Sequence, residues 1–217
     1  MHHNSTYFHL GQKLGLILSA VIFMNFTGCG VFVGNPNEDD DDSGNPKNQT
    51  TLSGSVVMGP VKGAVVKVYS LYGNGGRNEL LNSVKTDANG AYSMQISYSG
   101  PIELVASLGQ YEDEATGELV ERRENDELIT VLENQTKCHF AINPLTTIAA
   151  YKIRSEISKG LKEAITSSNQ SVAGMFGISG IDFVSTKPSD LTKSDANMDA
   201  SSPEGKVGLI MAGFSQM

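Results

Sequence analysis

The chain has 217 residues, a net charge of −8, two cysteines and no tryptophan. Nucleic-acid binding depends on Lys and Arg side chains that neutralise phosphates, so an acidic chain predicts no nucleic-acid partner. His139 is the sole histidine after residue 28. A zinc site built on two or three histidines is therefore excluded from that part of one chain.

An apolar run at residues 14–26 follows Lys13 near the start of the chain. A helix that crosses a bilayer needs about 20 apolar residues, and this run is shorter. Its length and its basic neighbour are typical of the apolar region of a secretory signal peptide. We therefore expect residues 1–28 to be a signal peptide, with a membrane-spanning signal anchor as an alternative.

The next residues carry a resemblance. Phe26, Thr27, Gly28 and Cys29 resemble the lipobox of bacterial lipoproteins, in which an aliphatic residue, a small residue and Gly or Ala precede Cys. Phe26 departs from the aliphatic pattern. The resemblance implies cleavage between Gly28 and Cys29, diacylglycerol on the Cys29 sulfur and an acyl chain on its new amine. The alternative is a signal peptide without lipid.

Lipidation at Cys29 has consequences for location and for cysteine chemistry. Each buried methylene contributes about 0.8 kcal/mol, so three acyl chains hold a protein at a membrane essentially permanently. Residue 30 is Gly rather than Asp, and for a Gram-negative source the resemblance then favours the outer membrane over the inner one. With Cys29 acylated, Cys138 has no partner for an intramolecular disulfide.

Cys138 and His139 are neighbours in a predicted strand. Adjacent strand residues point to opposite faces, so they cannot form a nucleophile–base pair without a bulge. We expect a core thiol and a surface imidazole.

Residues 29–50 are rich in Gly, Pro, Asn and Asp, with five consecutive acids at 38–42. Such a run repels itself and stays solvated. The segment is predicted to be an acidic flexible tether that holds the domain some tens of Å from the membrane. Weak calcium binding by the acidic run is the alternative.

Residues 51–142 show short β-branched runs separated by Gly and Pro turns. Asp87, Asn89 and Gly90 form a predicted tight turn, since Asn-Gly supplies the positive φ of a hairpin. This spacing predicts an antiparallel β-sandwich. The expected strands are 52–57, 64–69, 80–85, 91–96, 102–106, 128–132 and 138–142.

Three parts of this region carry a second resemblance: Gly54, residues 59–69 (GPVKGAVVKVY) and residues 86–92 (TDANGAY). They are similar to a carboxypeptidase regulatory-like domain, a transthyretin-like sandwich close in architecture to collagen-adhesin B-type repeats. The match covers about residues 51–110. It implies a non-catalytic module, because such a domain is not a peptidase despite its name.

Residues 109–127 form a polar excursion from the predicted sheet. We expect a solvated loop. The alternative is that Glu112, Asp113, Glu114 and Asp126 converge on a calcium ion or a cationic ligand, since hard cations need several oxygen ligands at once. No other metal and no cofactor is expected.

The apolar period becomes helical in residues 143–217. Asn143 suits an N-cap and Pro144 the first helical position. One apolar stripe is expected to run through Ile165, followed by a short second helix ending at Gly177, a loop over 178–206 and a helix from Val207. The chain stops within that helix, which predicts a truncated chain or a helix completed by a partner. The order of elements resembles the front of larger bacterial surface lipoproteins.

These patterns predict a lipid-anchored, non-enzymatic envelope protein that binds or scaffolds at a surface. Its expected partners are the membrane, through the lipid, and an envelope protein or a glycan. One alternative is a glycan-binding module. Another is the accessory front part of a larger envelope enzyme. The tyrosines that could serve the glycan-binding alternative are Tyr69, Tyr72, Tyr92, Tyr98 and Tyr111.

Overall fold

The computed structural model describes residues 49–214, except 115 and 197. The predicted signal peptide, Cys29 and nearly all of the tether lie outside the described residues. The strands are β1 (Thr50–Val56), β2 (Val65–Leu71), β3 (Arg77–Lys85), β4 (Ala91–Ile96), β5 (Ile102–Ser107), β6 (Gln110–Glu112), β7 (Leu119–Glu121), β8 (Leu128–Leu132) and β9 (Phe140–Ile142). The helices are α1 (Pro144–Glu156), the 3₁₀ turn η1 (Ile157–Lys159), α2 (Leu161–Met175) and α3 (Pro203–Phe214).

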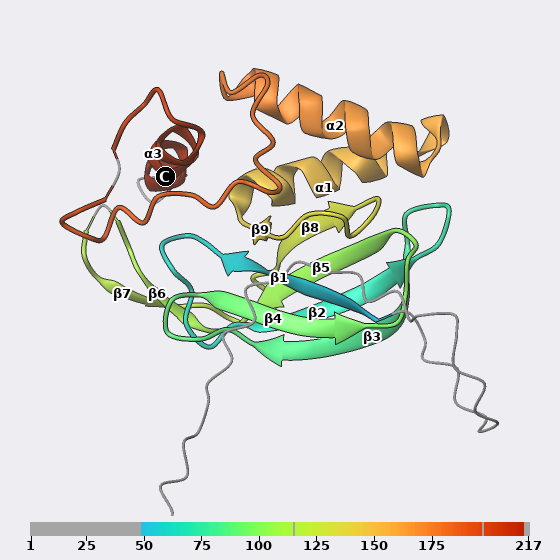
Figure 1. The fold of residues 1–217 in the computed structure, drawn as a ribbon, viewed down its shortest axis with the longest axis horizontal. Coiled ribbons are helices and arrows are strands. Elements are labelled where there is room, and N and C mark those ends of the chain that lie inside the picture. Colours follow the sequence, from blue (N-terminus) through green and yellow to red (C-terminus); the bar gives the residue numbers. More distant parts are fainter. Residues whose placement is uncertain (1–48, 115, 197, 215–217) are drawn as a thin grey trace, which may run out of the picture.

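Two sheets share one apolar core, with helices α1 and α2 on one side of them (Figure 1). The first has the order β4-β1-β9 and the second β3-β2-β5-β8. All pairs in the second sheet are antiparallel, but β1 and β9 are parallel. The expectation of a purely antiparallel arrangement was therefore wrong at β9. The chain leaves β8 in one sheet and enters the other alongside β1, in the same direction.

Side-chain alternation builds the core between the sheets. In β4 the buried positions are Tyr92, Met94 and Ile96, which alternate with exposed residues. They belong to the same core cluster as Val66 and Val68 of β2. Successive strand residues face opposite sides of a sheet, so this period of two directs one face of β4 inward.

Close backbone approach explains one glycine of the first sheet. A Cβ on Gly54 would lie 1.9 Å from the carbonyl oxygen of Phe140 in β9. The Tyr92 hydroxyl donates to that same oxygen at 2.9 Å. Any side chain at position 54 would therefore force β1 and β9 apart.

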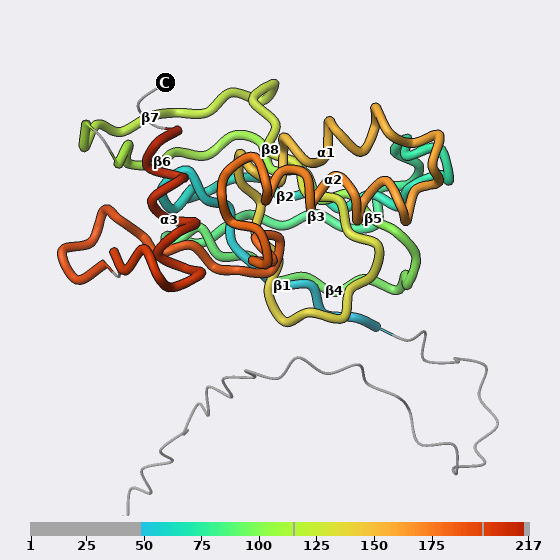
Figure 2. Tube along the Cα trace, turned by 90° about the horizontal axis from the view of Figure 1, so that it is seen from above, coloured from blue at the N-terminus to red at the C-terminus, as the bar shows by residue number. Residues whose placement is uncertain are grey.

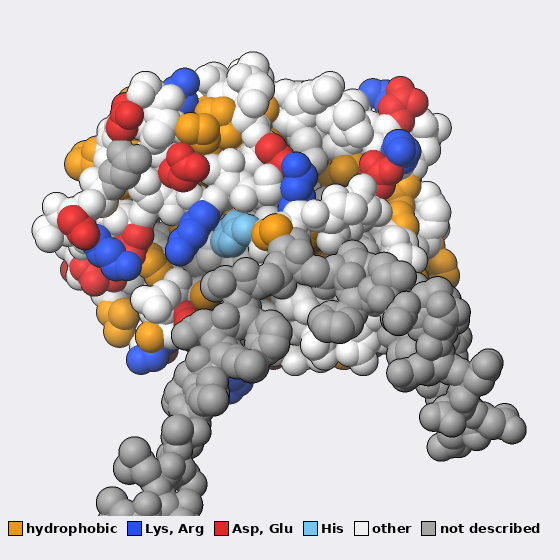
Figure 3. Space-filling view, viewed as in Figure 1, with side chains coloured by type: hydrophobic (Ala, Val, Ile, Leu, Met, Phe, Trp, Pro, Cys, Tyr) orange, Lys and Arg blue, Asp and Glu red, His pale blue; other side chains and the backbone are white. Residues whose placement is uncertain are grey.

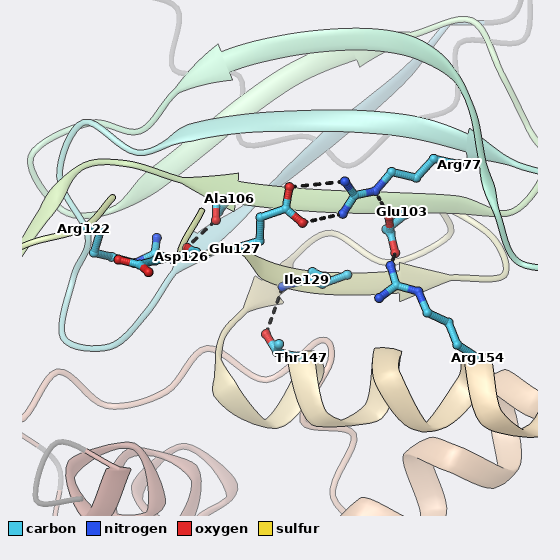
Figure 4. Close-up of polar contacts among 9 residues, drawn as sticks. All are labelled: Arg77, Glu103, Ala106, Arg122, Asp126, Glu127, Ile129, Thr147 and Arg154. Carbon is cyan, nitrogen blue, oxygen red and sulfur yellow. Dashed lines mark hydrogen bonds and ion pairs between the residues drawn. The ribbon is translucent and has the colours of Figure 1, made fainter. Parts of the chain in front are cut away.

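Helix α1 begins with a reciprocal cap. The Asn143 side chain accepts from the Thr146 backbone N–H, and the Thr146 hydroxyl accepts from that of Asn143. Such a cap satisfies backbone donors that a helix start would otherwise leave unpaired. Within α1, the Thr147 hydroxyl also accepts from the Ile129 backbone N–H of β8 at 2.9 Å (Figure 4). The cap and this bond fix the start of α1 over β8.

The predicted helical stripe is interrupted at Gly160, which has φ of 90°. A residue with a Cβ rarely adopts this left-handed value, so the chain turns here and α2 packs back against α1. The expectation of a continuous stripe through Ile165 followed by a short second helix was wrong. One helix instead runs from Leu161 to Met175.

The sheets and the C-terminal region share the same core. Leu145, Val172, Phe183 and Met211 are all buried in the cluster that holds the inner faces of both sheets. The segments between residue 143 and residue 214 therefore complete the hydrophobic core of the β region.

A buried carboxylate joins the second sheet to α1. The side chain of Glu103 in β5 is 1 % exposed and is paired with Arg77 of β3 and, at 2.5 Å, with Arg154 of α1. Arg77 also binds Glu127 through two contacts of 2.7 and 3.2 Å, as Figure 4 shows. The pKa of Arg77 is raised, first by its hydrogen bond to Glu127.

The polar excursion contains the β6–β7 hairpin, which lies with α3 at one end of the molecule in both Figure 1 and Figure 2. Its base is not solvated as expected, because Tyr111 and Arg122 are buried. Arg122 donates to the backbone oxygens of Ala106 and Asp126. Burial lowers the pKa of this guanidinium. The hairpin is thus attached to β5 through a buried arginine.

Replacing Glu103 with Gln should lower the free energy of unfolding by about 2 kcal/mol, because it removes the buried carboxylate that Arg77 and Arg154 share, while the two arginines left behind are 32 % and 37 % exposed. Urea unfolding measures this loss. Glu127→Gln is the matched control: that side chain is 36 % exposed, and its loss should cost less than about 1 kcal/mol. Equal losses in the two variants would contradict a special role for Glu103.

Candidate functional site

The turn at residues 87–90 closes over the end of β1. The Asp87 carboxylate accepts from the backbone N–H groups of Asn89 and Ala91 at 2.8 and 2.9 Å. Gly90 has φ of 72°, and a Cβ there would lie 2.7 Å from the Val56 oxygen. This turn forms one wall of the cleft described below.

The four acids considered for calcium lie in different surroundings. Glu112 is exposed, and the carboxylate of the buried Asp113 accepts from the Thr116 backbone and hydroxyl. Asp126 accepts from the Arg123 backbone N–H. Across the described part of the chain, no three His, Cys, Asp or Glu side chains are grouped as metal ligands.

Glu114 faces the C-terminal segment instead. Both of its carboxylate oxygens are shielded from solvent. Burial raises its pKa from 4.5 to about 7; the Leu191 backbone N–H opposes the rise and the charge of Asp190 adds to it. The ionisation of the Glu114 carboxyl, which follows β6, therefore depends on the segment that precedes α3.

A cleft of about 660 Å³ lies between the first sheet and the segment that leads to α3. This volume is within the usual range for small-molecule sites. The lining carries Lys187, Lys193, Asp190 and Glu204, of which Lys193 and Asp190 are paired at 3.3 Å. Its other residues are Ser55, Val57, Pro60, Asn89, Ala91, Pro188 and Ser189. These groups suit a polar ligand.

The imidazole of His139 lies beside this cleft. Its Nε2 atom is 3.2 Å from the Ser55 hydroxyl oxygen. Burial, together with the positive charge of Lys187, lowers the pKa of His139, so the neutral ring is favoured at pH 7. No carboxylate is hydrogen bonded to this ring among the residues that the structure describes.

The expectation of a buried Cys138 thiol and an exposed His139 imidazole was wrong. Cys138 is exposed, whereas His139 is partly buried against Ser55. The reason is local, since Cys138 precedes β9 and its carbonyl accepts from the Ser53 hydroxyl on the outer face of β1. Sequence reasoning missed Ser55 and Lys187, because a serine in a strand and a lysine in a loop carry no motif.

The tyrosines considered for glycan stacking are divided by the fold. Tyr92 and Tyr111 are buried, so the expectation that they are available to a ligand was wrong. Burial raises the pKa of both hydroxyls. Tyr72 is 53 % exposed, and Tyr69 has the Arg77 guanidinium over its ring, 5.3 Å from the centroid.

Charged side chains of both signs are scattered over the face seen in Figure 3. This mixture does not form a single-sign surface there. None of the helices within residues 49–214 is long and apolar enough to cross a membrane.

Comparison with known proteins assigns no family. No family model matches the chain, and no curated protein matches it. One solved structure shows a slight likeness: a 9R-lipoxygenase from Cyanothece PCC8801, with 10 % sequence identity and a TM-score of 0.28. The match covers 61 % of this chain and 26 % of that one. A likeness of this size carries no argument about fold or function.

Glu114→Gln should change how stability depends on pH. The carboxyl ionises near pH 4.5 when unfolded and near pH 7 when folded, so the folded state retains its proton longer and stability falls as pH rises through this window. The variant should therefore match the parent at pH 4 and gain on the order of 1 kcal/mol at pH 8. Urea unfolding across pH tests this, with exposed Glu112→Gln as the control. An unchanged profile in Glu114→Gln would refute the assignment.

The His139 titration should have its midpoint below the ordinary value of 6.5 in the folded chain. The stability that goes with the neutral ring is present above pH 6.5 and is lost as pH falls toward the folded pKa. Lys187→Met should raise the midpoint by removing a nearby positive charge, whereas Lys193→Met, whose charge is already paired, should leave it unchanged. Proton NMR of the ring measures both. A midpoint at 6.5 or above in the parent would rule out this environment.

Proposed function

We propose that the protein is a lipid-anchored, non-catalytic binding module of a bacterial cell envelope. The observation that carries this proposal is the 14–26 apolar run, whose last residue opens the Phe26-Thr27-Gly28-Cys29 segment. A run of this length suits export rather than a membrane span, and a lipobox cysteine converts export into anchoring.

The order of elements supports display away from the membrane. The acidic segment at 38–42 is followed closely by β1, which starts at Thr50. A solvated spacer of this size separates a folded domain from its anchor by some tens of Å. In this proposal the two-sheet region is a transthyretin-like module, and the helices extend its core.

The cleft beside the first sheet supports binding as the role of the displayed module. The 660 Å³ cleft combines hydroxyl, amide, ammonium and carboxylate groups in its lining. Because the comparisons supply no relative with a named ligand, the ligand must be argued from the chemistry of the surface.

The intact mass of membrane-extracted protein tests the anchor. The expected mass fits cleavage between Gly28 and Cys29 plus acyl chains, and Cys29→Ala should lack both the lipid and the membrane association. Cys138→Ala is the matched control, since Cys138 is the other thiol and is exposed; it should keep the lipid. An unlipidated mass in the parent, or loss of lipid in Cys138→Ala, would overturn the proposal.

A further inference from the structure

A second cleft lies between α2 and the segment that returns from it. It has a volume of about 440 Å³, again within the range of small-molecule sites. Helix α2 supplies one wall and the 179–183 segment the other. The lining residues are Ile165, Thr166, Asn169, Gln170, Ala173, Ser179, Gly180, Ile181, Asp182 and Phe183.

The returning segment is held firmly against the core. Ile178 and Phe183, on either side of it, are 2 % and 1 % exposed. The Ile178 backbone N–H donates to the Ala173 carbonyl oxygen at 2.9 Å. The Thr186 backbone N–H donates to the Asp182 carbonyl oxygen at the same distance. Gly180, with φ of 86°, makes the turn between these fixed points. The two walls of the cleft are therefore preformed.

The polar groups of the lining retain hydrogen-bonding capacity. Among the described residues, the amides of Asn169 and Gln170 take part in no intramolecular hydrogen bond. Asp182 accepts from the Ser185 hydroxyl at 2.6 Å and lies 4.0 Å from the Lys137 ammonium, in both cases through Oδ2. Its Oδ1 is left for a ligand. The cleft thus offers amide donors, amide acceptors and a carboxylate acceptor.

The charge and floor of the cleft narrow the ligand class. Its lining contains no Lys, Arg or His, and Asp182 is its single charged residue. Phosphate and carboxylate ligands would therefore meet the Asp182 charge, with the Lys137 ammonium, 4.0 Å from that carboxylate and outside the lining, as the nearby positive charge. The buried side chains of Ile165, Ala173 and Phe183 form an apolar floor. Side-chain amides and carboxylates match adjacent hydroxyl groups, and an apolar floor matches a C–H face.

We propose that this cleft binds a neutral sugar unit, such as the end of a glycan chain. Asn169 and Gln170 contact the ring hydroxyls from one side, and Asp182 accepts from a hydroxyl on the other. The site does not depend on the lipid at Cys29, so it stands or falls separately from the anchor.

Calorimetric titration of the detergent-solubilised full chain tests this site. The probes are methyl glycosides of glucose, mannose, galactose and N-acetylglucosamine, with glucuronate and glucose 6-phosphate as charged comparisons. At least one neutral glycoside should bind, and Asn169→Ala and Gln170→Ala should each weaken that binding at least tenfold. Both substitutions place a strong helix former at a side chain without internal bonds, so thermal unfolding should be unchanged.

Asn78→Ala is the matched control, an exposed amide on β3 away from the cleft. It should bind as the parent does, and Cys29→Ala should also keep binding. No heat with any neutral glycoside up to about 20 mM, tighter binding of the anionic probes, or an equal loss in Asn78→Ala would overturn the proposal.

Discussion

The carboxylate of Glu103 sets the position of α1 on the sheet. It is buried in β5 and is met by one arginine from β3 and one from the last turn of α1. A buried charge that loses a partner costs several kcal/mol, so the helix has to lie where Arg154 can reach it. With α1 fixed, the turn at Gly160 directs α2 back along α1, and the chain leaving α2 must cross the end of the first sheet.

That returning chain, residues 178–193, takes part in each of the candidate sites. It forms one wall of the α2 cleft, then one wall of the cleft at β1 and β4, and then it brings Asp190 near Glu114. The cleft at β1 and β4 therefore lies where this segment meets the first sheet, whereas the α2 cleft lies within the C-terminal region. Without these segments the hydrophobic core of the β region would be incomplete, and both clefts would lose one side.

Regular patterning made much of the fold predictable. The alternation in residues 91–96 and the Asn143-Pro144 start lie in the predicted elements. The parallel β1–β9 pair could not be predicted, because register between distant strands depends on packing rather than on local pattern. The burial of Arg122 was also missed. An arginine among acidic residues suggests an exposed side chain, yet its guanidinium donates to the backbone oxygens of Ala106 and Asp126. The unpaired amides of α2 carry no motif, so their shared cleft emerges only from the folded chain.

The position of β1 in the middle of its sheet has a mechanical consequence. It is hydrogen bonded to β4 along one side and to β9 along the other. A force applied through the residue before Thr50 acts along the strand, so it shears many hydrogen bonds at once, whereas an edge strand pulled sideways would unzip them in sequence. A pull on the chain before Thr50 would thus be borne by the strand of the first sheet that is hydrogen bonded on both sides.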